Sequence, residues 1–287
     1  MRADRHGHLW RTVGMTLAPL RGKALGFIGA GTMGQALMKG LLVQGISARA
    51  LRASDANGAT RREVSRRFGV DVRADNAAVA RRSDIVILAV KPQQFQEIVL
   101  QLAPHVTRRQ LVITIAAGIT LRWLQRRLPG VPVIRVMPNL PATIGSAFSA
   151  IAPGRAATTQ HRAMAKALFG AVGQVAELPE RYFDAITAVS GSGPAYVFFL
   201  VHMWEEAARS LGLPPAVASG AVRQTLEGSM RLLQASRLSA SELIGKVASK
   251  RGTTEAALKV LAKRRVAAHF AEALRAAARR SRALSWS

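Results

Sequence analysis

The sequence predicts an α/β protein in which a doubly wound parallel sheet is followed by an all-α helical domain. A short apolar run at residues 24–28 ends in glycines with G-x-G-x-x-G spacing, and helical periodicity follows from Thr32 to Val43. From Lys23 to about Leu178, short apolar runs alternate with amphipathic stretches, as in parallel sheets. Beyond Leu178 the pattern is helical only.

The glycine turn predicts a dinucleotide site of the Rossmann type. Gly29 permits a tight turn, Gly31 lets a pyrophosphate approach the backbone, and Gly34 allows close packing of helix on strand. The first N–H groups of the helix then face the phosphates. The alternative is an ordinary strand-to-helix turn in another kind of parallel sheet.

The remaining elements of the first domain follow in order. Helices from Thr32 and Thr60 are expected to end near Gly45 and Gly69, and Asp75 or Asn76 is expected to cap a third. The strands are expected at residues 24–28, 50–53, 85–90, 111–115, 133–136 and 174–178.

The end of the second strand is where the ribose of a dinucleotide is expected. Ser54, with arginines nearby, suits the 2′-phosphate of NADP, whereas Asp55 suits the free 2′-hydroxyl of NAD or only caps a turn. The residues thus leave NADPH and NADH both open.

The second domain is expected to be helical. Its helices are expected at residues 195–211, 216–233, 239–247, 254–263 and 266–283. Their long apolar faces exceed what about 100 residues bury alone, which favours pairing with a second chain. The predicted division is residues 1–22 as a flexible extension, 23–180 as the dinucleotide-binding domain and 181–287 as the substrate and dimerisation domain.

The extension lacks the apolar core and cleavage site of a secretory signal. We expect a disordered segment, with Met15 as an alternative start, rather than an arginine-rich transit peptide. A cytoplasmic location is the expectation.

Composition narrows the function. The chain has no cysteine, which excludes disulfides and thiolate sites, and its six histidines show no metal-ligand spacing, so no metal is expected. No apolar run approaches the roughly 18 residues that span a bilayer. The net charge of +25 makes nucleic acid a rival partner, but the basic residues are dispersed in pairs without interleaved aromatics, so no specific nucleic-acid binding is expected.

Six separated motifs resemble those of the pyrroline-5-carboxylate reductase family, over residues 23–284. The motifs are GFIGAGTMG (26–34), DIVILAVKPQ (84–93), AAGIT (116–120), RVMPNLPA (135–142), VSGSGPAYVF (189–198) and GTT (252–254). The resemblance implies reduction of 1-pyrroline-5-carboxylate to L-proline, the last step of proline biosynthesis, with NADPH as cofactor and NADH possible. It also implies a homodimer, with assembly into higher homo-oligomers open.

The resemblance and the strand ends together place the cofactor. The expected cofactor-binding residues are Gly29, Ala30, Gly31, Thr32, Met33, Gly34, Ser54, Asp55, Asn76, Ala89, Val90, Lys91, Pro92, Ala117 and Gly118. Lys91 is alternatively a solvated cation before a proline.

The substrate carboxylate is expected at two predicted helix starts. Ser192 is a plausible cap beside Pro194, and residues 252–254 open a later helix. The expected substrate-binding residues are Ser192, Gly252, Thr253 and Thr254; simple capping is the alternative.

Thr254 and Asn139 are the expected catalytic residues. Hydride passes to the C=N carbon, Thr254 hydrogen-bonds the ring nitrogen, with water as an alternative, and Asn139 lies near the nicotinamide or forms an Asx turn.

The chain departs from the family before the two threonines. Lys250 and Arg251 stand where the family commonly has proline and glycine, so Arg251 either adds a cation for the carboxylate or blocks the pocket if the position needs a positive φ. Residues 263–265 likewise replace a glycine-containing turn. The competing interpretations are another imine or β-hydroxyacid reductase, against which the SGSGPAY motif argues, and a non-catalytic dinucleotide- or nucleic-acid-binding homologue.

Overall fold

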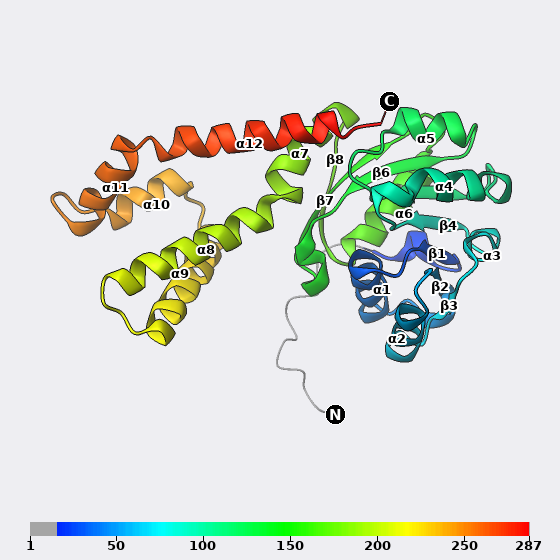
Figure 1. Cartoon of the computed structure of the whole chain (residues 1–287), viewed down its shortest axis with the longest axis horizontal. Helices are drawn as coiled ribbons and strands as arrows, with labels where there is room; N and C mark the ends of the chain where they lie inside the picture. The colour runs from blue at the N-terminus through cyan, green and yellow to red at the C-terminus, as the bar shows by residue number, and fades with distance from the viewer. Residues whose placement is uncertain (1–15, 287) are drawn as a thin grey trace. The chain divides into compact units, whose positions relative to one another are not determined.

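The computed structural model describes residues 16–286 and separates the chain into two compact units (Figure 1). Among the described residues, the first unit comprises 16–192 and 277–286, and the second comprises Gly193–Ala276. The first holds the sheet and the second is made of helices. The predicted start at Met15 lies outside the described residues.

The first unit is built on an eight-stranded sheet in the order β3-β2-β1-β4-β5-β6-β7-β8. Adjacent strands from β3 to β6 run parallel, β7 is antiparallel to β6, and β8 is parallel to β7. The predicted Rossmann-like fold is confirmed. The strands are β1 (Leu25–Ile28), β2 (Leu51–Ser54), β3 (Asp71–Arg73), β4 (Ile85–Leu88), β5 (Leu111–Thr114), β6 (Val133–Met137), β7 (Ala147–Pro153) and β8 (Gly173–Glu177).

Two of these strands, β3 and β7, were not predicted. β3 is a three-residue edge strand of sequence Asp-Val-Arg, which has no apolar run to reveal it. β7 reads Ala-Phe-Ser-Ala-Ile-Ala-Pro, in which small residues hide the pattern of a buried strand. Because β7 reverses direction, the sheet is mixed rather than wholly parallel, which corrects the prediction at that edge.

Helices cover both faces of the sheet, and successive strand residues supply two cores. Phe27 and Ile87 pack in the core beneath α1 and α6, whereas Ile28 and Leu88 pack beneath α3, α4 and α5. This two-sided burial explains why the central strands read as continuous apolar runs. The α-helices of the unit are α1 (Thr32–Val43), α2 (Gly58–Phe68), α3 (Asn76–Arg81), α4 (Pro92–Leu102), α5 (Leu121–Arg127), α6 (Thr159–Gly170) and α7 (Phe183–Ile186).

The end of the predicted flexible extension belongs to this core. A 3-10 turn, η1 (Ala18–Leu20), buries Leu20 to 1% exposure, and Leu17 packs against the same cluster. The flexible extension, predicted to reach residue 22, therefore ends earlier, because Leu17 and Leu20 pack against the core of the first unit.

The chain passes from the first unit to the second within continuous helix. A π-helical segment, η6 (Thr187–Gly191), joins α7 to α8 (Gly193–Ser210), and the N–H of Ser192 donates to the carbonyl of Thr187 at 2.8 Å. α8 begins next to the predicted start at Ser192, but Ser192 itself continues from the π-helical segment in a helical conformation and does not cap a free helix start. Pro194 has no N–H and crowds the carbonyl four residues earlier, and the wider π turn accommodates it without ending the helix.

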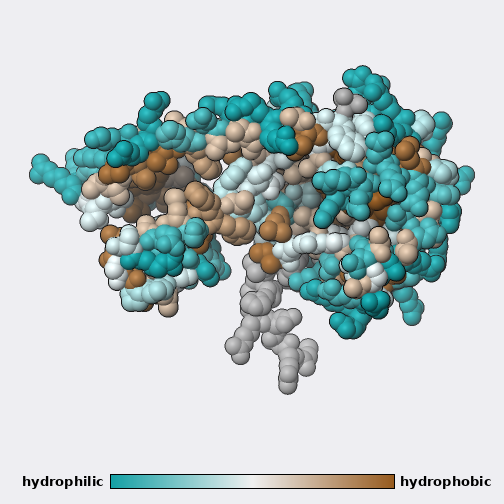
Figure 2. All heavy atoms as spheres, viewed as in Figure 1, coloured by the Kyte–Doolittle hydropathy of each residue, from teal (hydrophilic) through white to brown (hydrophobic). Residues whose placement is uncertain are grey.

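The second unit is all helical, as predicted. Its helices are α8, α9 (Pro215–Ala235), α10 (Ala240–Val247), α11 (Thr253–Lys263) and much of α12 (Val266–Ala283). Across this unit, all of which the structure describes, only Ala208, Ala218 and Val222 are buried apolar side chains. Apolar side chains consequently remain on its surface (Figure 2).

One described helical stretch, Glu180–Ser210, is long and apolar enough to cross a membrane by length and composition. Its exposed apolar residues include Phe198 at 60% and Phe199 at 67% exposure. The same property is expected of a helix face that packs against another protein chain, so it is weak evidence for a membrane span.

Candidate active site

The register of the sheet brings the predicted cofactor residues to one edge. Ile28 pairs with both Ser54 and Leu88, and Leu88 pairs with Thr114, so four parallel strands end in line. The loops that follow β1, β2, β4 and β5 therefore meet at this edge, and the loop after β6 follows Met137 beside them. Open α/β sheets bind their ligands at the carboxyl ends of such strands.

The glycine turn has the steric properties expected of it. Gly29 has φ +98°, and a Cβ there would lie 2.7 Å from the carbonyl oxygen of Ala89. A Cβ on Gly34 would lie 2.6 Å from the carbonyl oxygen of Gly29, so α1 packs closely on the turn. These two predicted roles are confirmed. A Cβ on Gly31 would meet nothing within 4 Å, which leaves open space beside its backbone.

Two helix starts at this edge lack a side-chain cap. Gly31 is the N-cap of α1 and Lys91 is the N-cap of α4, and neither helix receives a hydrogen bond from a capping side chain. The N–H groups of their first turns are therefore unused by such caps, and Pro92 removes one donor from α4. This arrangement fits the phosphates of a dinucleotide.

Two side chains brace the glycine turn at Ala30. The amide of Gln35 donates to the carbonyl of Ala30 at 2.9 Å, and the carboxylate of Asp55 accepts from the N–H of Ala30 at 3.0 Å. Gln35 was not predicted, although a glutamine one turn into a helix after a glycine motif is a readable signal. Asp55 also accepts from the N–H of Asn57 at 2.9 Å, which is the turn-capping role given as its alternative.

Ser54 does not present its hydroxyl at this edge. The residue is fully buried, and its Oγ has no hydrogen-bond partner among the described residues. The predicted contact between Ser54 and the cofactor conflicts with this burial, because the last residue of β2 faces the interior.

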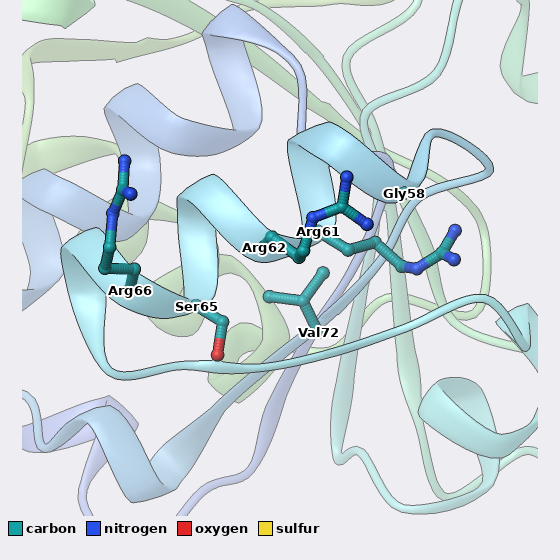
Figure 3. Close-up of a pocket in the computed structure, with 6 residues that line it drawn as sticks. All are labelled: Gly58, Arg61, Arg62, Ser65, Arg66 and Val72. Carbon is teal, nitrogen blue, oxygen red and sulfur yellow. The ribbon is translucent and has the colours of Figure 1, made fainter.

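Arginines take the exposed position near the end of β2. A cavity of about 500 Å³ is lined by α2 and β3 (Figure 3). Arg61 donates to the carbonyls of Asp55 at 2.9 Å and Ala56 at 2.8 Å, which fixes its guanidinium at the start of α2. Arg62 forms no hydrogen bond or ion pair with the described part of the chain, so its donors are available. The lining residues are Gly58, Arg61, Arg62, Ser65, Arg66 and Val72.

The other predicted residues around this edge differ in exposure. Lys91 is exposed, Ala89 and Val90 are half-buried, and Asn76 donates its amide to Gln101 at 3.1 Å, so it braces α3 against α4. In the loop after β5, Ala117 is exposed and Gly118 is buried.

Asn139 connects three segments of the first unit. Its amide donates to the hydroxyl of Ser190 in the π segment at 3.2 Å, and its carbonyl accepts from the N–H of Phe148 in β7 at 3.1 Å. The Asx-turn alternative is therefore wrong. Gly191, the residue after Ser190, packs closely against the side chain of Met137 at the end of β6, because a Cβ on Gly191 would lie 2.4 Å from that side chain. This network fixes the SGSG motif against the end of β6.

The predicted substrate residues separate into the two units. Ser192 is in the first, whereas Gly252, Thr253 and Thr254 open α11 in the second. Gly252 is the N-cap, no side chain caps this helix, and the predicted start of α11 is confirmed.

Arg251 holds a backbone conformation that favours glycine. Its φ is +58°, and its N–H donates to the carboxylate of Glu255. A hydrogen bond from Lys259, followed by the one from the Arg251 backbone, lowers the pKa of Glu255. Glu255 is thus held ionised and paired at the start of α11. Position 251 therefore has the positive φ at which Arg251, in place of glycine, was expected to block the substrate pocket.

Comparison with known proteins gives consistent results over almost the whole chain. A family model described as pyrroline-5-carboxylate reductase dimerisation matches residues 180–284, and one described as NADP oxidoreductase, coenzyme F420-dependent, matches residues 24–118. The pyrroline-5-carboxylate reductase of Synechocystis is 38% identical over 91% of this chain and 97% of its own length.

A second relative and two solved structures agree. The enzyme of the same description from Pseudomonas aeruginosa is 38% identical over 91% of this chain and 96% of its own. The Coxiella burnetii structure has a TM-score of 0.86 at 30% identity, covering 92% of this chain and 99% of that one. The Plasmodium falciparum structure, solved with NADP bound, has a TM-score of 0.84 at 25% identity with the same coverage.

Proposed function

Because the chain belongs to the pyrroline-5-carboxylate reductase family, we propose that it binds NADPH along the sheet edge described above and prefers it to NADH. Its activity is the NAD(P)H-dependent reduction of the C=N bond of 1-pyrroline-5-carboxylate to L-proline, in proline biosynthesis. The glycine turn carries the cofactor proposal: Gly31 leaves space beside an uncapped helix start.

The residues have separate roles in this proposal. Bound NADPH supplies the hydride that adds to the C=N carbon. The N–H groups of α1 hold the pyrophosphate, and Ala89–Pro92 and Ala117 line the same edge. Asn139, locked by Ser190 and Phe148, keeps the end of β6 in place beside the nicotinamide.

The carboxylate and the ring nitrogen of the substrate are assigned to the helical motifs. The N–H groups and hydroxyls of Thr253 and Thr254 bind the carboxylate at the start of α11, where the N–H of the N-cap Gly252 already donates to the carbonyl of Ser249 at 3.1 Å. Thr254 hydrogen-bonds the ring nitrogen, which ends as the amine of proline after taking one proton from solvent. A protonated imine is already electrophilic, so orientation is the main contribution of the protein.

Arg62 supports the preference for NADPH. Its guanidinium is free of protein partners among the described residues, and Arg61 beside it is fixed by two backbone carbonyls. Two arginines at the start of α2 suit the 2′-phosphate that distinguishes NADPH from NADH.

The test is a titration of Arg62→Ala with both cofactors. We expect the dissociation constant for NADPH to rise about tenfold, as for a lost charge-assisted contact, with that for NADH unchanged. Arg109→Ala is the control, because Arg109 is an exposed arginine in the loop before β5, at the edge of the sheet opposite the strand ends that hold the cofactor. Equal weakening of both cofactors by Arg62→Ala would refute the assignment.

The activity itself is tested by loss of the reduced-nicotinamide absorbance on adding pyrroline-5-carboxylate, in parallel with NADPH and NADH. Turnover with a higher kcat/KM for NADPH is expected. Folded protein that binds NADPH but does not turn over would favour the non-catalytic alternative, with Lys250 and Arg251 as the altered residues.

We also propose a cytoplasmic homodimer formed through the helical unit. The exposed apolar residues of that unit, including Phe198, Phe199 and Phe270, support burial against a second copy. Light scattering tests the dimer and leaves larger assemblies as a measurable outcome. Cell fractionation tests the location, and recovery in the membrane fraction would refute it.

A further inference from the structure

The segment after α12 docks on the loop that follows β5. The N–H of Trp286 donates to the carbonyl of Gly118 at 2.8 Å, and the hydroxyl of Thr120 donates to the carbonyl of Trp286 at 2.6 Å. Ile119 and Trp286 form an isolated parallel β-bridge. Backbone pairing therefore joins two parts of the first unit that are far apart in sequence.

Aromatic packing anchors the Trp286 side chain. Its ring meets that of Trp123 edge-on, with centroids 5.1 Å apart, and it packs against the core beneath α4 and α5. Trp123 is itself fixed by Phe95 at 5.8 Å and by the guanidinium of Arg127, 3.8 Å from its ring. The docked indole thus rests on side chains that are already held.

Gly118 is shaped for this docking. Its φ is +80°, and a Cβ would lie 2.6 Å from the carbonyl oxygen of Leu284. Only glycine combines that backbone with so close an approach. Gly118 was expected to contact the cofactor, but its positive φ and its close approach to Leu284 already require glycine without any ligand.

Apolar packing holds part of this loop, because Ala116 and Ile119 are buried in the core beneath α4 and α5. The N–H of Ile115 donates to Leu88 at 3.3 Å, which places the start of the loop beside the β4 end. Within the described part of the chain, Trp286 supplies the hydrogen bond that ties residues 117–119 to another segment. The exposed residue of this stretch is Ala117.

We propose that Trp286 is a positioning residue, which holds the loop of residues 116–120 so that Ala117 keeps its place along the bound dinucleotide. The inference rests on the proposed function, in which this loop lines the cofactor. Loosening the loop adds an ordering cost to cofactor binding, so the affinity for NADPH falls while the phosphate contacts of the glycine turn remain.

The test compares three variants of the full chain by NADPH titration. Trp286→Ala is expected to raise the dissociation constant about fivefold, at the low end of couplings between separate sites. Trp286→Phe, which keeps an aromatic ring and the backbone bonds, is expected to restore most of the affinity. Ser285→Ala is the matched control, because its hydroxyl donates to Ser281 and not to the loop.

An unchanged dissociation constant in Trp286→Ala, with or without a lower melting temperature, overturns the proposal and leaves a structural role only. If Trp286→Ala does not fold, hydrogen exchange of the wild-type protein decides. Saturating NADPH is expected to slow exchange at residues 117–120 and at Trp286 together, and unaltered exchange at Trp286 overturns the proposal. Turnover of the wild-type protein is measured separately, so failure of the proposed function is distinguishable from failure of this inference.

Discussion

Helix starts in the described part of this chain are of two kinds, those with a side-chain cap and those without one. Side chains cap α2, α3, α5, α6 and α10, through Asn57, Asp75, Thr120, Thr158 and Ser239. No side chain caps α1, α4, α7, α9 or α11. Residues predicted to bind cofactor or substrate lie at the starts of α1, α4 and α11, and Asn76, also predicted to bind the cofactor, opens the capped helix α3. The first N–H groups of a helix need partners, so an anionic ligand can take the place of the missing caps.

The uncapped starts also differ from one another. The turn before α1 has glycine where φ is positive and is braced by Gln35 and Asp55. The turn before α11 has Arg251 at a positive φ, braced by the half-buried Glu255, which pairs with the exposed Lys259. The turn before α1 is therefore held by side chains of the first unit and has glycine at its positive φ, whereas the turn before α11 carries backbone strain at Arg251.

The largest effect is expected from filling the open space at α1. Gly31→Glu places a carboxylate where the pyrophosphate binds, so we expect NADPH affinity to fall at least about 100-fold through like-charge repulsion and lost space. Isothermal titration measures it. Val43→Glu adds the same charge at the exposed far end of α1 and serves as the control. Unchanged affinity in Gly31→Glu would remove the basis for the cofactor site.

Removing a hydroxyl at the start of α11 is expected to act on the substrate alone. Thr254→Ala should lower kcat/KM for pyrroline-5-carboxylate about tenfold, through one lost hydrogen bond to a charged group, and leave NADPH affinity unchanged. Thr254→Ser, which keeps the hydroxyl, should retain most of the activity. If the alanine variant is as active as the wild type, the substrate site lies elsewhere.

The sequence was sufficient for features that depend on local chemistry. The glycine spacing predicted the turn, its helix and its close packing, and the apolar runs located six strands to within a few residues. The cap at Asp75 was predicted for the same reason, because a capping side chain lies next to the helix it caps.

Features that depend on distant segments were not readable. The burial of Ser54, the clamp between Asn139 and Ser190, and the docking of Trp286 join residues that no local pattern connects. The π segment was missed because Ser-Gly-Ser-Gly-Pro resembles a helix start, and only packing reveals that the helix continues. The reversal at β7 likewise depends on which neighbour the strand pairs with.

A smaller effect is expected from relieving the strain at the substrate turn. Arg251→Gly should stabilise the protein by up to about 1 kcal/mol, since a left-handed residue other than glycine costs about 1–2 kcal/mol and glycine loses more chain entropy on folding. Arg265, with φ +54°, provides the matched site away from α11's start. Both glycine variants should melt higher, and only Arg251→Gly should alter the KM for pyrroline-5-carboxylate. If Arg265→Gly also changed the KM, the KM change in Arg251→Gly would be explained by relief of strain and not by a position near the substrate.

The smallest effect is expected at a capped start, α6, where the cap includes a titratable group. His161 accepts from the N–H of Thr158 at 3.1 Å, and burial, with Lys23 nearby, lowers the pKa of His161 below its usual 6.5. The folded state therefore favours neutral His161, so its contribution is present above pH 6.5 and is lost as the pH falls below that value. We expect a loss of about 0.5 kcal/mol, the low end for a helix cap, in thermal melts between pH 7.5 and about pH 5.5. His161→Gln keeps an acceptor that does not titrate, so its melting temperature should fall less over the same range. Identical pH dependence in the two proteins would show that the stability of this capped start does not depend on the protonation of His161.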